Sequence, residues 1–432
     1  MLRISWISLL VLSVLSGVPT RSAQAEILVG LAQTDITPPL GGLTTGYSSA
    51  QPTDGVHDPI TVRVVVLKSA SSTVAIVVCD LCVFNSAWLH EEAKKLQIDS
   101  LLLMNTHTHA GPSMSQDDFP SAEQPWRRTV EERTLAAIQQ AQKEMFTGHF
   151  EAADAQIQLG YNRLVHRGEY SVTHFENPER IPYGQVDTQV GVIRITDDES
   201  RIRAVLVNYA CHPVVLGPRN IKLSADYPGV TRTQVEEAVG NDAMCVFIQG
   251  AAGDINPLFL ARSPDREQDF EVVEAMGSML TTEVLRALSF MEGKPGKSQS
   301  FQCMSSQGTF QHRFETDQTI TLGVASLLIN EDIGIVTMPG EPFHKFQQDF
   351  RHKADLPHAY LFGYCCNAGY DWPSYLPDLV SAARGGYGAS DTTRAEVGSG
   401  ERLINEGLVQ LFTLQGRLKP EPQRHTYDTE PK

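Results

Sequence analysis

The sequence is poor in cysteine, in positive charge and in long apolar runs, and each shortage excludes a class of protein. Its seven cysteines are odd in number and irregular in spacing, which excludes a small scaffold built on disulfides. With 35 Lys and Arg against 51 Asp and Glu, the net charge is −16, which argues against a nucleic-acid partner and against simple docking on an anionic membrane. Small-molecule and lipid substrates are the partners that remain.

The N-terminus has the pattern of an export signal. Arg3 gives a short basic start, residues 4–18 are mostly apolar, and Ala23-Gln24-Ala25 is a cleavage pattern. The apolar run is short and interrupted by Ser, and no later segment is long and apolar enough to cross a bilayer. We therefore expect a signal peptide at 1–25, no stable membrane span after its cleavage, and a secreted or periplasmic protein. An uncleaved signal anchor is the alternative.

Short apolar, β-branched runs alternate with helical patterns, which predicts an α/β layered fold with a mixed β-sheet flanked by helices. Strands are predicted at 27–32, 61–68, 74–79, 101–105, 189–195, 202–209, 244–249, 319–329 and 333–338. Helices are predicted at 87–96, 126–146, 228–239, 267–290, 343–353 and 401–414. No internal repeat is apparent. We expect one catalytic domain at 26–418, with a linker at 291–300 that could divide it, and a polar, disordered tail at 419–432.

Chemically capable side chains follow directly after four of the predicted strands. These residues are His107 and His109, His212, Asp254, and Glu341. Sites in α/β sheets form at the carboxyl ends of strands, because the loops that follow neighbouring strands meet there. The sequence therefore predicts one active site at the C-terminal ends of the strands.

His107-Thr108-His109 is a candidate metal-binding segment. In an extended chain, residues two apart point the same way, so both imidazoles would face one site. His212 is a candidate third imidazole and Glu341 an anionic oxygen ligand, although a core histidine and a helix-terminal glutamate are equally simple explanations of these two. Two His and one Glu with an open position form a common catalytic zinc set. We expect one Zn²⁺ per chain, while manganese or iron would also suit these ligands.

Several further residues have two interpretations. Asp254, in a run of small residues, is expected either to orient a ligand histidine or to cap a turn. Asp80 ends a strand and is expected to line the crevice, whereas Asp226 is expected to cap a helix. Cys79 and Cys82 show a redox-like spacing, but they are better explained as a buried strand end.

Two tyrosines and an arginine could act on a substrate. Tyr375 and Tyr387 lie in a stretch rich in Gly and Tyr, and a phenol can donate to a developing oxyanion. Arg163 could hold a substrate oxygen. From the residues alone, interface or core aromatic rings explain the two tyrosines better, and a solvated surface residue is the usual explanation of an arginine.

Together these segments resemble the N-terminal catalytic domain of the neutral/alkaline non-lysosomal ceramidase family, over roughly 26–418. The matching motifs are Asn105-Thr-His-Thr-His-Ala-Gly-Pro, Tyr161-Asn-Arg-Leu, Asn208-Tyr-Ala-Cys-His-Pro, Phe247-Ile-Gln-Gly-Ala-Ala-Gly-Asp-Ile-Asn-Pro, Pro339-Gly-Glu, and the pair Tyr375 and Tyr387. The resemblance implies zinc-dependent cleavage of the amide bond of an N-acyl sphingoid base (ceramide) or a similar N-acyl compound, giving fatty acid and amine.

The resemblance also implies a role for each matching residue. It implies that zinc is bound by His107, His212, Glu341 and Tyr375, and that the amide is positioned, and the transition state stabilised, by His109, Arg163 and Tyr387.

The sequence departs from the family at two motifs. Asn256 replaces a family Ser, and Ser113-Met114 replaces a Gly-Gly pair. A metallohydrolase of another amide or ester, and a metal-containing binding protein without catalysis, therefore stay open as alternatives.

Overall fold

The computed structural model describes residues 26–49, 51–114, 119, 122–240, 242–261, 267–291, 293, 299–366 and 371–418. The expected signal peptide at 1–25 and tail at 419–432 lie outside the described residues, as do 292 and 294–298 of the expected linker. Among the helices of the described ranges, none has both the length and the apolar character needed to span a bilayer.

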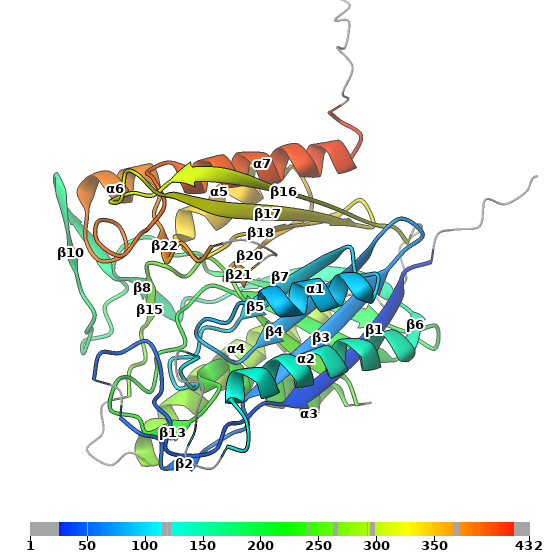
Figure 1. Cartoon of the computed structure of the whole chain (residues 1–432), viewed down its shortest axis with the longest axis horizontal. Helices are drawn as coiled ribbons and strands as arrows, with labels where there is room; N and C mark the ends of the chain where they lie inside the picture. Colours follow the sequence, from blue (N-terminus) through cyan, green and yellow to red (C-terminus); the bar gives the residue numbers. More distant parts are fainter. Residues whose placement is uncertain are drawn as a thin grey trace, which may run out of the picture.

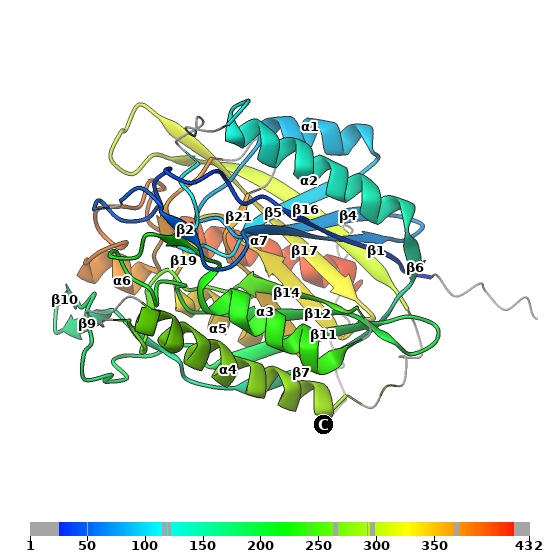
Figure 2. The same ribbon diagram turned by 90° about the horizontal axis from the view of Figure 1, so that it is seen from below.

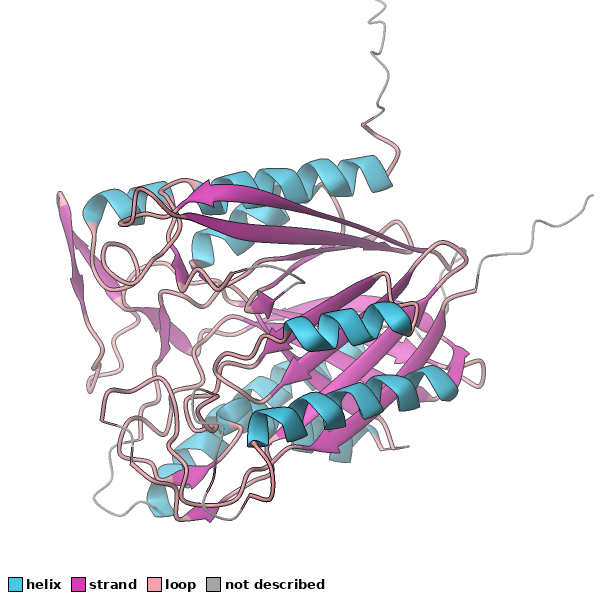
Figure 3. Cartoon of the chain, viewed as in Figure 1, coloured by secondary structure: helices cyan, strands magenta, loops and turns pink. Residues whose placement is uncertain are grey.

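Three mixed sheets form the frame of the protein, with helices on the outside (Figure 3). The first sheet, in spatial order, contains β21 (Cys365–Cys366), β5 (Ser100–Asn105), β4 (Thr73–Cys79), β3 (Thr61–Lys68), β1 (Leu28–Asp35) and β6 (Met145–Thr147). The second contains β14 (Met244–Gln249), β12 (Ile202–Tyr209), β11 (Gln189–Thr196) and β7 (His149–Gln156). The third contains β16 (Phe301–Gln311), β17 (Thr319–Ile329), β18 (Ile333–Thr337) and β20 (His358–Phe362). The predicted α/β fold with mixed sheets flanked by helices is confirmed.

Four small two-stranded sheets lie in the connecting loops, and several of them gather at the left end of the molecule in Figure 1. They pair β9 (Leu164–Arg167) with β10 (Tyr170–Thr173), β2 (Gly55–Val56) with β13 (Lys222–Leu223), β8 (Gly160–Asn162) with β15 (Ile255–Pro257), and β19 (Glu341–Pro342) with β22 (Tyr375–Leu376). The helices are α1 (Ala87–Lys95), α2 (Trp126–Lys143), α3 (Asp226–Val239), α4 (Glu267–Ser289), α5 (His344–Ala354), α6 (Leu379–Arg384) and α7 (Ser399–Leu414).

One structural unit occurs three times along the chain. Each unit has two antiparallel pairings followed by a parallel pair with a helix between its strands. The three units contain β1-β3-β4-α1-β5, β7-β11-β12-α3-β14 and β16-β17-β18-α5-β20. The structure thus contains a repeat of topology, although the sequence shows no internal repeat. The units share topology and apolar patterning while their residues differ, so the repeat is not visible as repeated letters.

The sheets share a central core and each has its own outer core. Inward side chains of all three sheets, including Val65, Leu206 and Leu327, form one buried cluster. On the outer faces, α1 and α2 cover the first sheet, α3 and α4 the second, and α5 and α7 the third. Figure 2 shows α3 and α4 side by side across the second sheet. Central strands such as β4, β11 and β14 are buried on both faces and read as continuous hydrophobic runs that can be found in sequence, whereas the edge strand β16 is largely exposed.

Local chemistry fixes several element ends. Ser86 begins α1 by accepting a hydrogen bond from the Leu89 amide, and Asp378 caps α6 in the same way. Gly240 ends α3 with φ 67°, a conformation that glycine adopts without strain. The predicted helix at 126–146 ends earlier, at Lys143, because Met145 to Thr147 pair with β1 as an edge strand.

Candidate metal centre

Each of the three units supplies one donor residue from the loop after a strand of its parallel pair. His107 follows β5, His212 follows β12, and Glu341 follows β18. A Glu341 carboxylate oxygen lies 3.1 Å from Nε2 of His212 and 3.3 Å from Nε2 of His107. One donor atom from each of the three buried residues lies within 4.8 Å of the other two. The three sheets thus converge on a group that has the composition of a metal site.

Backbone carbonyls fix the orientation of both imidazoles. Nδ1 of His107 lies 2.7 Å from the carbonyl oxygen of Cys82, and Nδ1 of His212 lies 2.7 Å from that of Ala252. A carbonyl oxygen only accepts, so each Nδ1 carries the proton and each Nε2 presents a lone pair. Hydrogen bonds of this kind typically orient metal-ligating histidines. The donor set therefore fits a divalent ion.

The charges at this group also suit a divalent cation. Burial alone would raise the pKa of Glu341, but the neighbouring imidazoles of His107 and His212 hold it well below its ordinary value. Burial lowers the pKa of His212 to about 4, so this ring is neutral near pH 7. The pKa of His107 moves the other way: burial lowers it, but Cys82 and the Glu341 carboxylate raise it well above its ordinary value, so an ion that binds here displaces a proton from this ring.

His107 and His109 come together by a route that differs from the predicted one. The segment is not extended, because His107 has φ 67° in the left-handed region. The two rings nevertheless meet, with their Nε2 atoms 3.3 Å apart. The expectation that alternation in an extended chain aligns the rings was wrong, and a strained backbone at His107 brings them together instead.

The loop at Gly46 and Tyr47 packs against His109. The Tyr47 ring centroid lies 5.0 Å from that of His109, edge to face. Gly46 has φ 90°, and a Cβ atom at this position would lie 2.1 Å from Nδ1 of His109. Glycine is therefore required here both for the backbone conformation and for space.

Arg163 is buried beside the centre, not solvated. Its guanidinium donates to the carbonyl oxygen of Gly253 (2.6 Å) and to the side-chain oxygen of Asn256 (3.1 Å), and its backbone amide donates to Asp254 (2.9 Å). Asn256 thus holds the arginine in place.

Tyr375 and Tyr387 stack around this arginine. The Arg163 guanidinium carbon lies 5.3 Å from the Tyr375 ring centroid and 5.1 Å from that of Tyr387. In the parallel pair of β19 and β22, Tyr375 lies opposite Glu341, which places it next to the metal-ligand candidates. Burial and the nearby Glu341 carboxylate raise the pKa of the Tyr375 phenol, so it is a proton donor at neutral pH.

The sequence of this chain matches a known family over most of this architecture. The model of the neutral/alkaline non-lysosomal ceramidase N-terminal domain matches residues 27–291. The chain belongs to this family. Family membership supports a hydrolase with a lipid substrate; the family is metal-dependent, and the buried His/Glu group could bind a metal.

Solved structures agree with this assignment. A neutral ceramidase from Pseudomonas aeruginosa is 16% identical with a TM-score of 0.69, and the match covers 94% of this chain and 77% of that chain. A ceramidase complexed with C2 is 15% identical, with the same TM-score and coverage. At these identities the likeness shows a shared fold. A search of curated proteins finds no match.

Within the ceramidase fold, two of the predicted aspartates have other partners than expected. Asp254 orients no ligand-candidate histidine: its carboxylate accepts hydrogen bonds from Nδ1 (2.6 Å) and the amide (2.8 Å) of His344. Asp80 does not line a crevice, because it is fully buried in a bidentate pair with Arg232. Both partners lie far away in sequence, on helices that only the tertiary fold brings near.

The structure also places two residues at the centre to which the sequence had given no role there. Cys82, expected to end a buried strand, lies against His107, and Tyr364 places its ring centroid 4.5 Å from that of His107. Both follow strands of the parallel pairs, as His107 and His212 do. The rule that chemistry follows strand ends would have found Cys82, which follows the predicted strand 74–79, but not Tyr364, because β20 was not predicted. Asp226 is the first residue of α3, but its predicted capping role was wrong: the N-cap residue is Ala225, without a side-chain cap hydrogen bond, and the Asp226 carboxylate accepts from the Tyr227 and Leu216 amides.

Proposed function

We propose that this chain is a zinc-dependent hydrolase that cleaves the amide bond of an N-acyl sphingoid base, or a similar N-acyl lipid, to fatty acid and amine. The observation that carries the proposal is the convergence of Nε2 of His107, Nε2 of His212 and the Glu341 carboxylate within 4.8 Å of one another. Arg163 and Tyr387 beside this group supply the polar contacts that an amide needs. We also propose that the protein is secreted or periplasmic and holds one zinc ion per chain in the domain 26–418.

Each residue has a proposed task. His107, His212 and Glu341, with Tyr375 as a further ligand, would hold the ion. When bound, zinc supplies a Lewis acid for the carbonyl and lowers the pKa of water toward neutrality.

The other proposed residues act on the substrate. Burial and the neighbouring imidazoles lower the pKa of His109 well below its ordinary value, so its neutral ring can accept a proton. Arg163 and the Tyr387 phenol are placed to donate to the amide oxygen as negative charge develops on it. Asp254 would be a positioning residue, because it accepts hydrogen bonds from His344 and from the Arg163 backbone amide.

An apolar rim beside Arg163 supports a lipid substrate. Phe175 is 48% exposed, and its ring centroid lies 5.0 Å from that of Tyr387. The Arg163 guanidinium carbon lies 5.8 Å from the Phe175 ring centroid. An exposed apolar ring next to a polar site suits a ligand with one amide and long hydrocarbon chains.

The test is fatty-acid release by the purified, zinc-loaded protein from three kinds of substrate: N-acyl sphingosines of increasing chain length, an N-acyl amino sugar and a simple ester. Release from the N-acyl sphingosines that is lost on chelation supports the proposal. Release from the sugar or ester alone would support metal-dependent hydrolysis and contradict the proposed lipid substrate. Zinc binding without release from any of them would favour a binding protein.

Gly46→Ala is expected to lower kcat/KM by about 100-fold, because the new Cβ would displace the His109 ring and a shift of about 1 Å in a catalytic group can cost that much. Gly168→Ala is the matched control: Gly168 has φ 67°, similar backbone strain follows, and no atom lies within 4 Å of its Cβ position. Steady-state kinetics and thermal unfolding of both variants check this. Equal kcat/KM for the two would show that His109 does not need its present position.

A further inference from the structure

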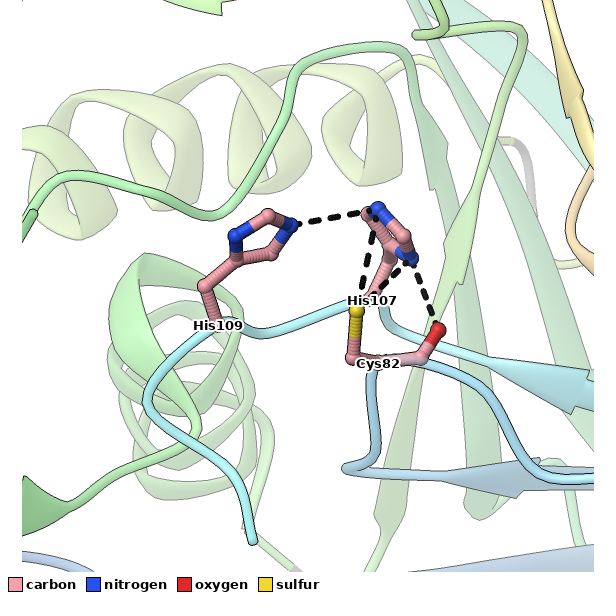
Figure 4. A group of neighbouring side chains, drawn as sticks. All are labelled: Cys82, His107 and His109. Carbon is pink, nitrogen blue, oxygen red and sulfur yellow. Dashed lines mark hydrogen bonds between the residues drawn. The ribbon is translucent and has the colours of Figure 1, made fainter. Parts of the chain in front are cut away.

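Cys82 belongs to a second group of donor atoms at this centre. The thiol is 6% exposed, and its sulfur lies 3.5 Å from Nδ1 and 3.9 Å from Nε2 of His107. Donor atoms of Cys82, His107 and His109 lie within 4.8 Å of one another. Figure 4 shows the side chains of Cys82 and His109 beside the His107 ring. This group shares His107 with the His212 and Glu341 group but is distinct from it.

The spacing of the second group fits an ion. Zinc–sulfur bonds of about 2.3 Å and zinc–nitrogen bonds of about 2.0–2.1 Å place the donor atoms of a tetrahedral site roughly 3.3–3.7 Å apart. The His107 and His109 Nε2 atoms lie 3.3 Å apart, and the Cys82 sulfur lies 3.9 Å from Nε2 of His107. Small side-chain movements would complete the geometry.

The repeated unit gives an independent reason to treat Cys82 as a donor. Cys82 is the third residue after β4, and His212 is the third residue after β12, the matching strand of the second unit. Glu341 is the fourth residue after β18, the matching strand of the third unit. The first unit therefore places a thiol where the other two place the imidazole and the carboxylate.

We propose that Cys82, His107 and His109 form a second, thiolate-containing metal position that competes with the first for His107. His107 offers one lone pair, at Nε2, because its Nδ1–H donates to the Cys82 carbonyl. One lone pair binds one ion, so the two positions are alternatives. A divalent ion that enters the second position displaces the thiol proton to solvent and forms a metal–sulfur bond.

The two positions select different ions. Thiolate and imidazole ligands favour soft ions, whereas the carboxylate of Glu341 makes the first position harder. A soft ion such as Cd²⁺ would hold His107 away from His212 and Glu341. If the proposed function holds, soft ions inhibit hydrolysis because binding to Cys82 takes His107 away from the first position.

The experiment titrates Cd²⁺ into the chelator-treated full-length protein and records the ultraviolet sulfur-to-cadmium charge-transfer band. The wild type is expected to show the band, Cys82→Ser to lose it, and His109→Ala to bind Cd²⁺ at least about tenfold more weakly. Cys303→Ser, which removes a partly exposed thiol of the third sheet, should keep the band. A band that survives in Cys82→Ser would overturn the proposal.

A further variant distinguishes two alternative metal positions from a single shared ion. His212→Ala removes a donor of the first position alone, so the band should persist in it. If the band disappears, Cys82 is a ligand of a single shared ion and the second position does not exist. These readouts need no substrate, so a failure of amide hydrolysis would count against the proposed function and leave this result intact.

Discussion

Glu341→Ala is expected to abolish stoichiometric zinc binding and to lower kcat/KM by more than ~100-fold. Loss of a residue that merely supports a metal ligand costs about 10- to 100-fold. Glu341 contacts both ligand-candidate imidazoles itself and is the anion of the set. Without it, the two imidazoles alone would have to hold a divalent cation in a buried site. Metal content by elemental analysis and fatty-acid release check the two parts of this prediction.

Glu131→Ala is the matched control for that variant. Glu131 is also a buried glutamate, but it lies on α2 and accepts a hydrogen bond from Ser86 at 2.6 Å, away from the metal centre. Its loss should reduce stability while zinc content and kcat/KM per folded molecule stay at wild-type values. Full zinc occupancy in Glu341→Ala would mean that the ion binds elsewhere, and the assignment of this centre would fail.

The main strands were predictable because their burial on both faces leaves a strong signal. β3, β12, β14 and β17 begin and end at the predicted residues. β7 was missed because its residues, His149 to Gln156, are rich in Ala and charge, which are poor indicators of a strand. It forms by pairing along its whole length with β11, so tertiary structure overrides its weak local preference.

The metal-ligand candidates could be found from the sequence, whereas the backbone groups that orient them could not. A polar residue after an apolar strand is visible in the chain, and His107, His212 and Glu341 all have this property. The carbonyls of Cys82 and Ala252 that orient the two rings are backbone groups with no sequence signature. The positive φ of His107 could not be predicted either, because a histidine residue by itself does not indicate this backbone conformation.

The pairing of Asp80 with Arg232 also has no signature in the sequence, because the two residues lie far apart along the chain. Arg232→Ala is expected to lower the free energy of unfolding by about 3–5 kcal/mol, because it leaves the Asp80 carboxylate buried without its counter-charge. The two guanidinium nitrogens lie 2.6 and 2.8 Å from the two carboxylate oxygens, and one of these oxygens also accepts from the Thr61 hydroxyl. Equilibrium denaturation measures the loss.

A double variant tests whether the loss of stability comes from the unpaired charge of Asp80. Asp80→Asn with Arg232→Met removes both charges and keeps most of the volume, so it should recover much of the stability that Arg232→Ala loses, as neutral replacements of buried ion pairs often do. The pair joins the end of β4 to α3, and so ties the first unit to the second. Below the unfolding transition, kcat/KM should stay at its wild-type value in Arg232→Ala. A variant that keeps its stability but loses activity would instead return Asp80 to the reaction crevice, where the sequence alone had placed it.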